Sequence, residues 1–197
     1  KGFTQTNSGD NVGAWSSRDN SRIALLKRMA DNIWNTHPDA YVILEHFADN
    51  SEETELANYG MMLWGNLHYA YSQLAMGYED NAKIDYAYHE TRGWNNPHLV
   101  SYMESHDEER LMYQLLNNGN NSGGYSTKNV NTALERMKAV SALFYTIPGP
   151  KMLWQFGEFG YDVSIDENGR TGEKPLLWNY LDEVNRRRLS KTTSEII

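Results

Sequence analysis

YVILEH at residues 41–46 and VSYMESHD at residues 100–107 are two short apolar runs, and each of them ends in acidic and imidazole side chains. A carboxylate at the end of a buried strand must be paired or must face water in a cleft, because an isolated buried charge is costly. Helical sequence separates the two runs. We therefore expect two strands of a parallel sheet, with one site at the edge where both strands end.

Helices and strands alternate along the predicted chain. We expect helices at about 19–37, 67–76, 108–116, 132–145 and 175–189, and strands at 41–47, 61–64, 99–104 and 152–156. This order is typical of a parallel α/β fold. Four strands do not close a barrel, which takes eight, so the pattern predicts either a small open sheet or half of a barrel.

Composition narrows the classes of partner. The chain has 197 residues, a net charge of −8 and no cysteine, which argues against nucleic acid as the main partner and excludes disulfides and thiolate metal sites. Its longest apolar runs fall short of the ~20 residues of a membrane span. The acids at the ends of the two predicted strands suggest a chemistry, because a pair of carboxylates facing one cleft is the catalytic arrangement of glycoside hydrolases.

Four segments, in order along the chain, resemble motifs of the alpha-amylase family of glycoside hydrolases. YMESHDEER at 102–110 is similar to the seventh-strand motif, which ends in Asn-His-Asp with an Arg three residues on, and VILE at 42–45 is similar to the fifth-strand motif. TIPGPKMLWQFGE at 146–158 resembles the entry to strand eight, and KPLLW at 174–178 with RRRL at 186–189 resembles the final helix. The resemblance implies that residues 1–197 form a partial catalytic domain, the second half (strands 5–8) of a TIM (β/α)8 barrel.

The resemblance also implies roles for particular residues. Glu45 would be the general acid/base, and Asp107 the third carboxylate, which stabilises the oxocarbenium-like transition state. His106 would bind a sugar hydroxyl, and Lys1 and His46 would contact the substrate on the leaving-group side. Because Lys1 matches a lysine that follows the family's Asp nucleophile by three residues, the nucleophile would lie upstream of residue 1.

Further expectations follow from the same resemblance. The isolated chain should be inactive on its alpha-glucan oligosaccharide substrate, and it should pair with the missing half of the barrel or with a second copy. No cofactor is expected; calcium occurs in the family, but Gly2 replaces a histidine associated with it. An extracellular or periplasmic parent is implied, although the sequence fixes no compartment.

Other interpretations of the same residues stay open. The chain could be a non-catalytic glucan-binding or interaction fragment, or an unrelated small α/β protein, and the motifs do not separate an amylase from an alpha-glucosidase or a transglycosylase. Asp107 could also cap a helix, and Glu158 could be a substrate contact or a buried partner. We interpret Arg110 as the partner of a nearby carboxylate, 48–58 as an acidic surface segment with a solvated helix start at Glu52 and Glu53, and Arg186–Arg188 as a cluster at a helix C-terminus.

Overall fold

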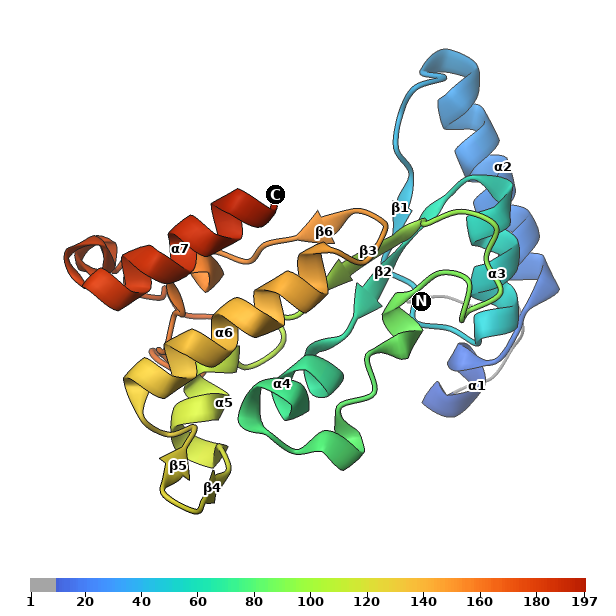
Figure 1. Ribbon diagram of the computed structural model, residues 1–197. Coiled ribbons are helices and arrows are strands. Elements are labelled where there is room, and N and C mark those ends of the chain that lie inside the picture. The colour runs from blue at the N-terminus through green and yellow to red at the C-terminus, as the bar shows by residue number, and fades with distance from the viewer. Residues whose placement is uncertain (1–9) are drawn as a thin grey trace. The chain divides into compact units, whose positions relative to one another are not determined.

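The computed structural model describes residues 10–197, and its main strands form a four-stranded sheet (Figure 1). The order is β1-β2-β3-β6, with β1 at Ile43–Leu44, β2 at Met62–Asn66, β3 at Leu99–Tyr102 and β6 at Lys151–Met152. Strands β1 and β2 are parallel, with Ile43 opposite Met62. The predicted α/β class with a parallel sheet is confirmed.

Helices connect these strands. The α-helices are α1 (Val12–Ser16), α2 (Asn20–Thr36), α3 (Asn50–Tyr59), α4 (His68–Met76), α5 (Leu111–Asn118), α6 (Val130–Tyr145) and α7 (Val184–Ile196). Short 3-10 turns are η1 (Glu79–Asn81), η2 (Asp85–Ala87), η3 (Gly157–Phe159) and η4 (Trp178–Asp182), and β4 (Asn121–Ser122) with β5 (Tyr125–Ser126) forms an antiparallel hairpin. Each predicted helix except the last overlaps an observed helix, although α5 begins at Leu111, three residues later than predicted.

The last predicted helix is wrong in its position. Residues 175–183 hold η4 instead of an α-helix, and α7 begins at Val184. The physical reason is tertiary packing, because Leu177 and Tyr180 in this stretch join an aromatic cluster. Arg186–Arg188 therefore lie in the first half of α7, which corrects their assignment to a helix C-terminus.

The described residues group into two compact units, and the division falls within β2 and β3. Unit 1 takes residues 10–65, 85–101 and 148–150. Its core packs one face of α2 against α3, β2 and β3, through the buried residues Ile23, Leu26, Ala30, Leu56, Ala57, Met61, Leu63, Trp94 and Leu99. Asp19 begins α2, because its carboxylate accepts hydrogen bonds from the N–H groups of Ser21 and Arg22.

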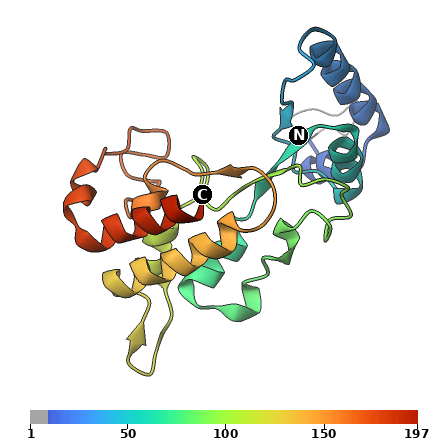
Figure 2. The ribbon, with the colours of Figure 1, turned by 45° about the horizontal axis from the view of Figure 1, so that its top comes forward.

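Unit 2 takes residues 66–84, 102–147 and 151–197. Helices α4, α5, α6 and α7 pack together in it, and α6 and α7 lie side by side (Figure 2). A second core of Phe156, Phe159, Tyr161 and Tyr180 lies between β6 and α7 along the chain. From residue 10 to residue 197, no helix combines the length and the apolar character needed to cross a membrane.

Candidate functional site

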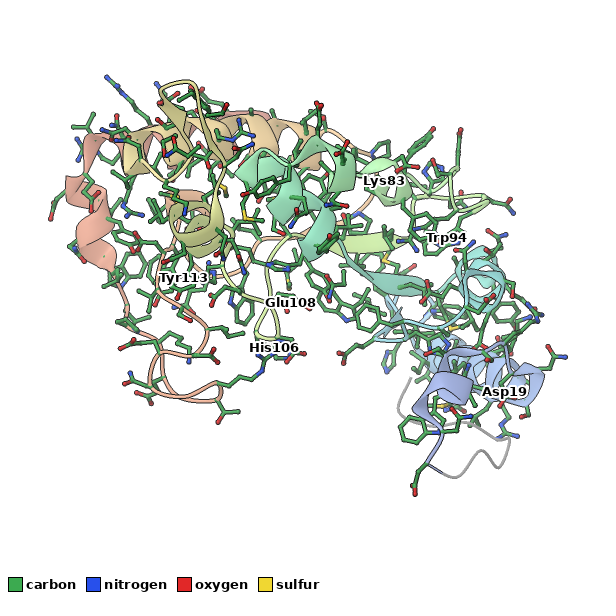
Figure 3. The ribbon with its side chains drawn as sticks, turned by 90° about the horizontal axis from the view of Figure 1, so that it is seen from below. Asp19, Lys83, Trp94, His106, Glu108 and Tyr113 are labelled. Atoms are coloured by element: carbon green, nitrogen blue, oxygen red, sulfur yellow. The ribbon has the colours of Figure 1, made fainter. Side chains whose placement is uncertain are left out.

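A cavity of about 360 Å³ lies in unit 2, beside the loop that follows β3. Figure 3 labels His106 and Glu108 in this loop. His106 and Asp107 both line it, so the structure brings these two predicted residues together. The remaining lining residues come from the β3 loop, from Trp154 and from the segment 161–174: Ser105, Arg110, Tyr161, Val163, Ser164, Ile165, Arg170, Thr171, Gly172 and Lys174.

His106 and Asp107 present their side chains to solvent. Their side chains are 68% and 55% exposed, and Nε2 of His106 lies 3.3 Å from Oδ2 of Asp107. The indole of Trp154 is 6.0 Å from the imidazole, centroid to centroid. Ser105 fixes the turn, because its Oγ accepts a hydrogen bond from the Asp107 N–H at 3.0 Å. The carboxylate of Asp107, the imidazole of His106 and the indole ring of Trp154 are therefore all available to one polar ligand.

The segment 162–174 forms another wall of the cavity. Arg170 donates a hydrogen bond to the carbonyl of Asp107, and its Nη2 lies 4.0 Å from Oδ1 of the same residue. Lys174 Nζ donates to the carbonyls of Glu167, Gly169 and Gly172 at 2.7, 2.8 and 3.0 Å. The loop is thus closed on itself and tied to Asp107. No motif in the sequence signalled Arg170.

Glu104 and Arg110 form a buried pair, and Arg110 also lines the cavity. Arg110 Nη2 donates to Oε2 of Glu104 at 2.9 Å and to the carbonyl of Gln155 at 2.7 Å. The predicted pairing of Arg110 with a carboxylate is confirmed. The capping alternative for Asp107 is wrong, because α5 begins only at Leu111, whose N–H donates to Oε1 of Glu104 at 2.6 Å.

Glu158 follows β6 in a half-buried position, and burial raises the pKa of its carboxyl group. Glu158 and Tyr145 line a second, smaller pocket. Burial and the negative charges of Glu104 and Glu158 raise the pKa of the Tyr145 hydroxyl there. Within the described part of the chain, that hydroxyl has no hydrogen-bond partner. Glu158 is thus a partly buried acid that lines this small pocket together with Trp154.

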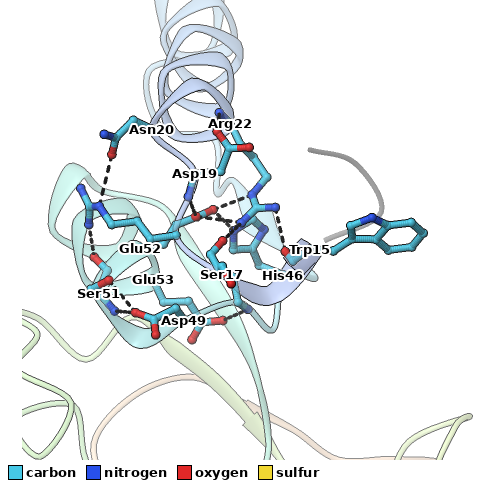
Figure 4. Close-up of polar contacts among 12 residues, drawn as sticks. Trp15, Ser17, Asp19, Asn20, Arg22, His46, Asp49, Ser51, Glu52 and Glu53 are labelled. Atoms are coloured by element: carbon cyan, nitrogen blue, oxygen red, sulfur yellow. Dashed lines mark hydrogen bonds and ion pairs between the residues drawn. The ribbon is translucent and has the colours of Figure 1, made fainter. Parts of the chain in front are cut away.

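In unit 1, Glu45 directly follows β1 and is exposed, whereas His46 is 4% exposed. Nε2 of His46 lies 2.5 Å from Oε1 of Glu52 (Figure 4). The structure thus places His46 in a buried polar cluster, and its contact with a substrate stays a prediction. Lys1 lies outside the described residues.

Glu52 is the centre of that cluster and is fully buried. It accepts two hydrogen bonds from Arg22, at 2.7 and 2.8 Å, and one from the Asp19 N–H at 2.8 Å. Burial by itself raises the pKa of Glu52, but the hydrogen bonds from His46, Arg22 and Asp19 outweigh it and hold the pKa at about 2. The interpretation of Glu52 as solvated is wrong, because Arg22, 30 residues away, covers it.

Glu53, the next residue, is also buried, which corrects the same interpretation. Burial raises the pKa of its carboxyl group against the attraction of Arg92, whose Nη1 lies 3.5 Å from Oε2 of Glu53. The Arg92 guanidinium lies 3.8 Å from the ring centroid of Tyr86 and 5.2 Å from that of Trp94. The segment predicted as an acidic surface therefore carries two buried carboxylates.

No protein-family model and no curated protein matches this chain. Across residues 10–197, no three His, Cys, Asp or Glu side chains gather closely enough to hold a metal ion. Unit 2 therefore holds a cavity lined by His106 and Asp107. Unit 1 separately holds an exposed Glu45 whose neighbour in the chain, His46, belongs to a buried ionic cluster.

Proposed function

We propose that this chain is part of the catalytic domain of an alpha-amylase-like retaining glycoside hydrolase that acts on the alpha-glucosidic bonds of starch-type glucans. The observation that carries the proposal is the cavity of unit 2, where Asp107 and His106 lie beside the Trp154 indole. A carboxylate and an imidazole can hydrogen-bond sugar hydroxyls, while an aromatic ring packs against the apolar face of a sugar.

Two carboxylates carry the proposed chemistry of this chain. Glu45 protonates the leaving glycosidic oxygen and later removes a proton from the attacking water. Asp107 holds sugar hydroxyls and stabilises the positive charge that develops on the sugar ring in the transition state. The exposed position of Glu45 directly after β1 supports its role as a proton donor that meets substrate.

The covalent step needs a third carboxylate as nucleophile, and we propose that it lies upstream of Lys1. The chain then contributes strands five to eight of a (β/α)8 barrel and is inactive alone. It completes its sheet by pairing with the missing half or with a second copy, because an open barrel leaves sheet edges unpaired. The parallel sheet with the order β1-β2-β3-β6 is compatible with this proposal.

Binding of maltoheptaose to the 197-residue chain tests the proposal, with a β-linked cello-oligosaccharide as the ligand control. We expect chemical shift changes at His106, Trp154 and Arg170. Asp107→Asn should weaken binding about tenfold, since a hydrogen bond to a charged group is worth ~1.5–3 kcal/mol. The matched control is Asp182→Asn, an exposed carboxylate of unit 2 that does not line the cavity.

The outcomes separate the alternatives. Equal binding of both oligosaccharides, or equal effects of Asp107→Asn and Asp182→Asn, would contradict the proposal. Binding that is never accompanied by hydrolysis, even after an upstream polypeptide with an Asp nucleophile is added, favours a non-catalytic glucan-binding fragment. Hydrolysis by the chain alone would mean that the nucleophile lies among these 197 residues.

A further inference from the structure

The turn that follows Glu45 contains a strained residue. Phe47 has a φ of 52°, in the left-handed region that side chains with a Cβ rarely adopt. Such a conformation persists only where the surroundings hold it, and it is found preferentially at functional sites. Because β1 is only two residues long, this turn decides how the chain leaves the strand at Glu45.

The first restraint on the turn acts through His46. Its imidazole is bonded to Glu52, which is itself held by the guanidinium of Arg22 (Figure 4). Arg22 also donates to the carbonyls of Trp15 and Ser17, at 2.8 and 2.9 Å. Glu52 is therefore fixed from several directions, and it transmits this rigidity to the residue next to Glu45.

The second restraint acts on the turn's backbone. The N–H of Ala48 donates to Oε1 of Glu53 at 3.1 Å, and Glu53 is anchored by the stacked guanidinium of Arg92. The N–H of Asp49 donates to the carbonyl of Ser16 at 2.6 Å. The residues on both sides of Phe47 are thus tied to buried carboxylates at the start of α3.

We infer that Glu52 and Glu53 are positioning residues, which hold the strained turn 46–49 and thereby fix the direction of the Glu45 carboxyl group. The inference rests on the proposed role of Glu45 as proton donor. A proton donor must lie within hydrogen-bond reach of the leaving oxygen, and a displacement of about 1 Å can cost ~100-fold in rate. Two adjacent acids, each bonded to one side of Phe47, supply that precision.

The variants Glu52→Gln and Glu53→Gln in the 197-residue chain test the restraint by NMR. Glu55→Gln is the matched control, because Glu55 lies on the same helix but bonds to Lys27 and Arg18 instead of the turn. We expect the strong intraresidue amide–Hα NOE of a left-handed Phe47 to weaken, and the amides of Ala48 and Asp49 to exchange about tenfold faster or more. Retention of both signals in both variants would overturn the inference.

A rescue experiment separates strain from general loss of stability. Phe47→Gly removes the strain, because glycine adopts positive φ freely, whereas Phe47→Ala removes the ring and keeps the strain. We expect Phe47→Gly, and not Phe47→Ala, to restore slow exchange at Ala48 in the Glu53→Gln background. Equal exchange rates at Ala48 in the Phe47→Gly and Phe47→Ala variants would contradict the role of Glu53 in holding the strained turn.

The positioning of Glu45 has its own readouts. Its side-chain carbon shifts should change in the Glu52 and Glu53 variants and stay constant in Glu55→Gln; a relaxed turn with unchanged Glu45 shifts would refute the positioning role. In an assembly with an upstream polypeptide that hydrolyses glucan, kcat should fall ~10–100-fold while KM stays within about twofold. Absence of hydrolysis in every assembly would count against the proposed function, whereas the NMR results decide the positioning inference by themselves.

Discussion

The carboxylate of Glu109 accepts a hydrogen bond from the backbone N–H of Ile165 at 2.9 Å, although 56 residues separate them. Its other oxygen accepts from Oγ of Ser164 at 2.7 Å. Glu109 thus connects the segment that carries His106 and Asp107 with the loop that carries Arg170. Through this residue, one wall of the cavity determines where the other wall lies.

Glu109→Ala should therefore loosen the loop 162–174 without unfolding the chain. The hydrogen bonds from Ser164 and Ile165 to the carboxylate are lost, while the buried ion pair of Glu104 and Arg110 remains. We expect faster hydrogen exchange at Ile165 and an about tenfold loss of maltoheptaose affinity, because binding must then order the loop. Exchange mass spectrometry and calorimetry measure these effects, with Glu135→Ala as the control, because Glu135 is an exposed acid of unit 2 that pairs with Lys138 and does not line the cavity. An unchanged exchange rate at Ile165 would refute the connection.

Gly65 packs closely against Leu99, and this contact predicts that a larger residue at position 65 lowers the stability of the fold. A Cβ at Gly65 would lie 2.6 Å from Cγ and Cδ1 of Leu99, far inside van der Waals contact. Gly65→Ala should lower the free energy of unfolding by about 1–3 kcal/mol, as overpacking does.

Urea unfolding measures this loss, and Gly13→Ala is the control, because among residues 10–197 a Cβ there would meet Asn11 alone, at 3.3 Å. Combining Gly65→Ala with Leu99→Val should recover part of the loss, since the smaller side chain leaves room. Equal stability of Gly65→Ala and the parent chain would contradict the packing described for β2 and β3.

Acid should destabilise the chain through Glu52. The pKa of this carboxyl is about 2 in the folded chain and near 4.5 when unfolded, so its stabilising contribution is complete above pH ~5 and is lost as the pH falls toward 2. Glu52→Gln should cost ~3 kcal/mol at neutral pH and little near pH 2. Urea unfolding across this pH range measures the difference, with exposed Glu173→Gln as control. A cost independent of pH would contradict the ionised state of Glu52.

Arg186 should matter far more than its neighbour Arg188. Arg186 bonds to Asp162 at 2.8 Å and to Glu183 at 2.9 Å, and its guanidinium lies 3.8 Å from the Tyr180 ring. Its replacement by Ala should cost about 3 kcal/mol, because Asp162 loses its buried cationic partner. Arg188→Ala, at an exposed position, should stay within about 0.5 kcal/mol. Thermal unfolding of both variants tests the difference, and similar melting temperatures would contradict it.

Local patterns in the sequence predicted much of this fold. The apolar spacing and the caps placed a helix at 19–37, and the structure has α2 at Asn20–Thr36. The motif around 102–107 placed His106 and Asp107 together at the end of a strand, and both line the cavity. The helix and the loop after β3 were predictable because neighbouring residues determine helix starts, strand ends and short turns. The catalytic and binding roles of His106 and Asp107 stay predictions.

Contacts between distant residues were not predictable in this way. Glu52 and Glu53 look solvated in an acidic run, yet Arg22 and Arg92 bury them from 30 and 39 residues away. The strand at 152–156 shortens to Lys151–Met152, because Phe156 enters the aromatic cluster. Arg170 reaches Asp107 across 63 residues, and no local pattern marks such a contact.

The division of the chain into interleaved segments has a consequence for its synthesis. Unit 1 includes residues 148–150, and the N–H of Ser101 donates to the carbonyl of Pro150 at 3.1 Å. A nascent chain that leaves the ribosome from its N-terminus therefore carries an incomplete first unit until residue 150 has emerged. During this interval β3 lacks its last partner, and a chaperone that binds extended segments has its best opportunity to act.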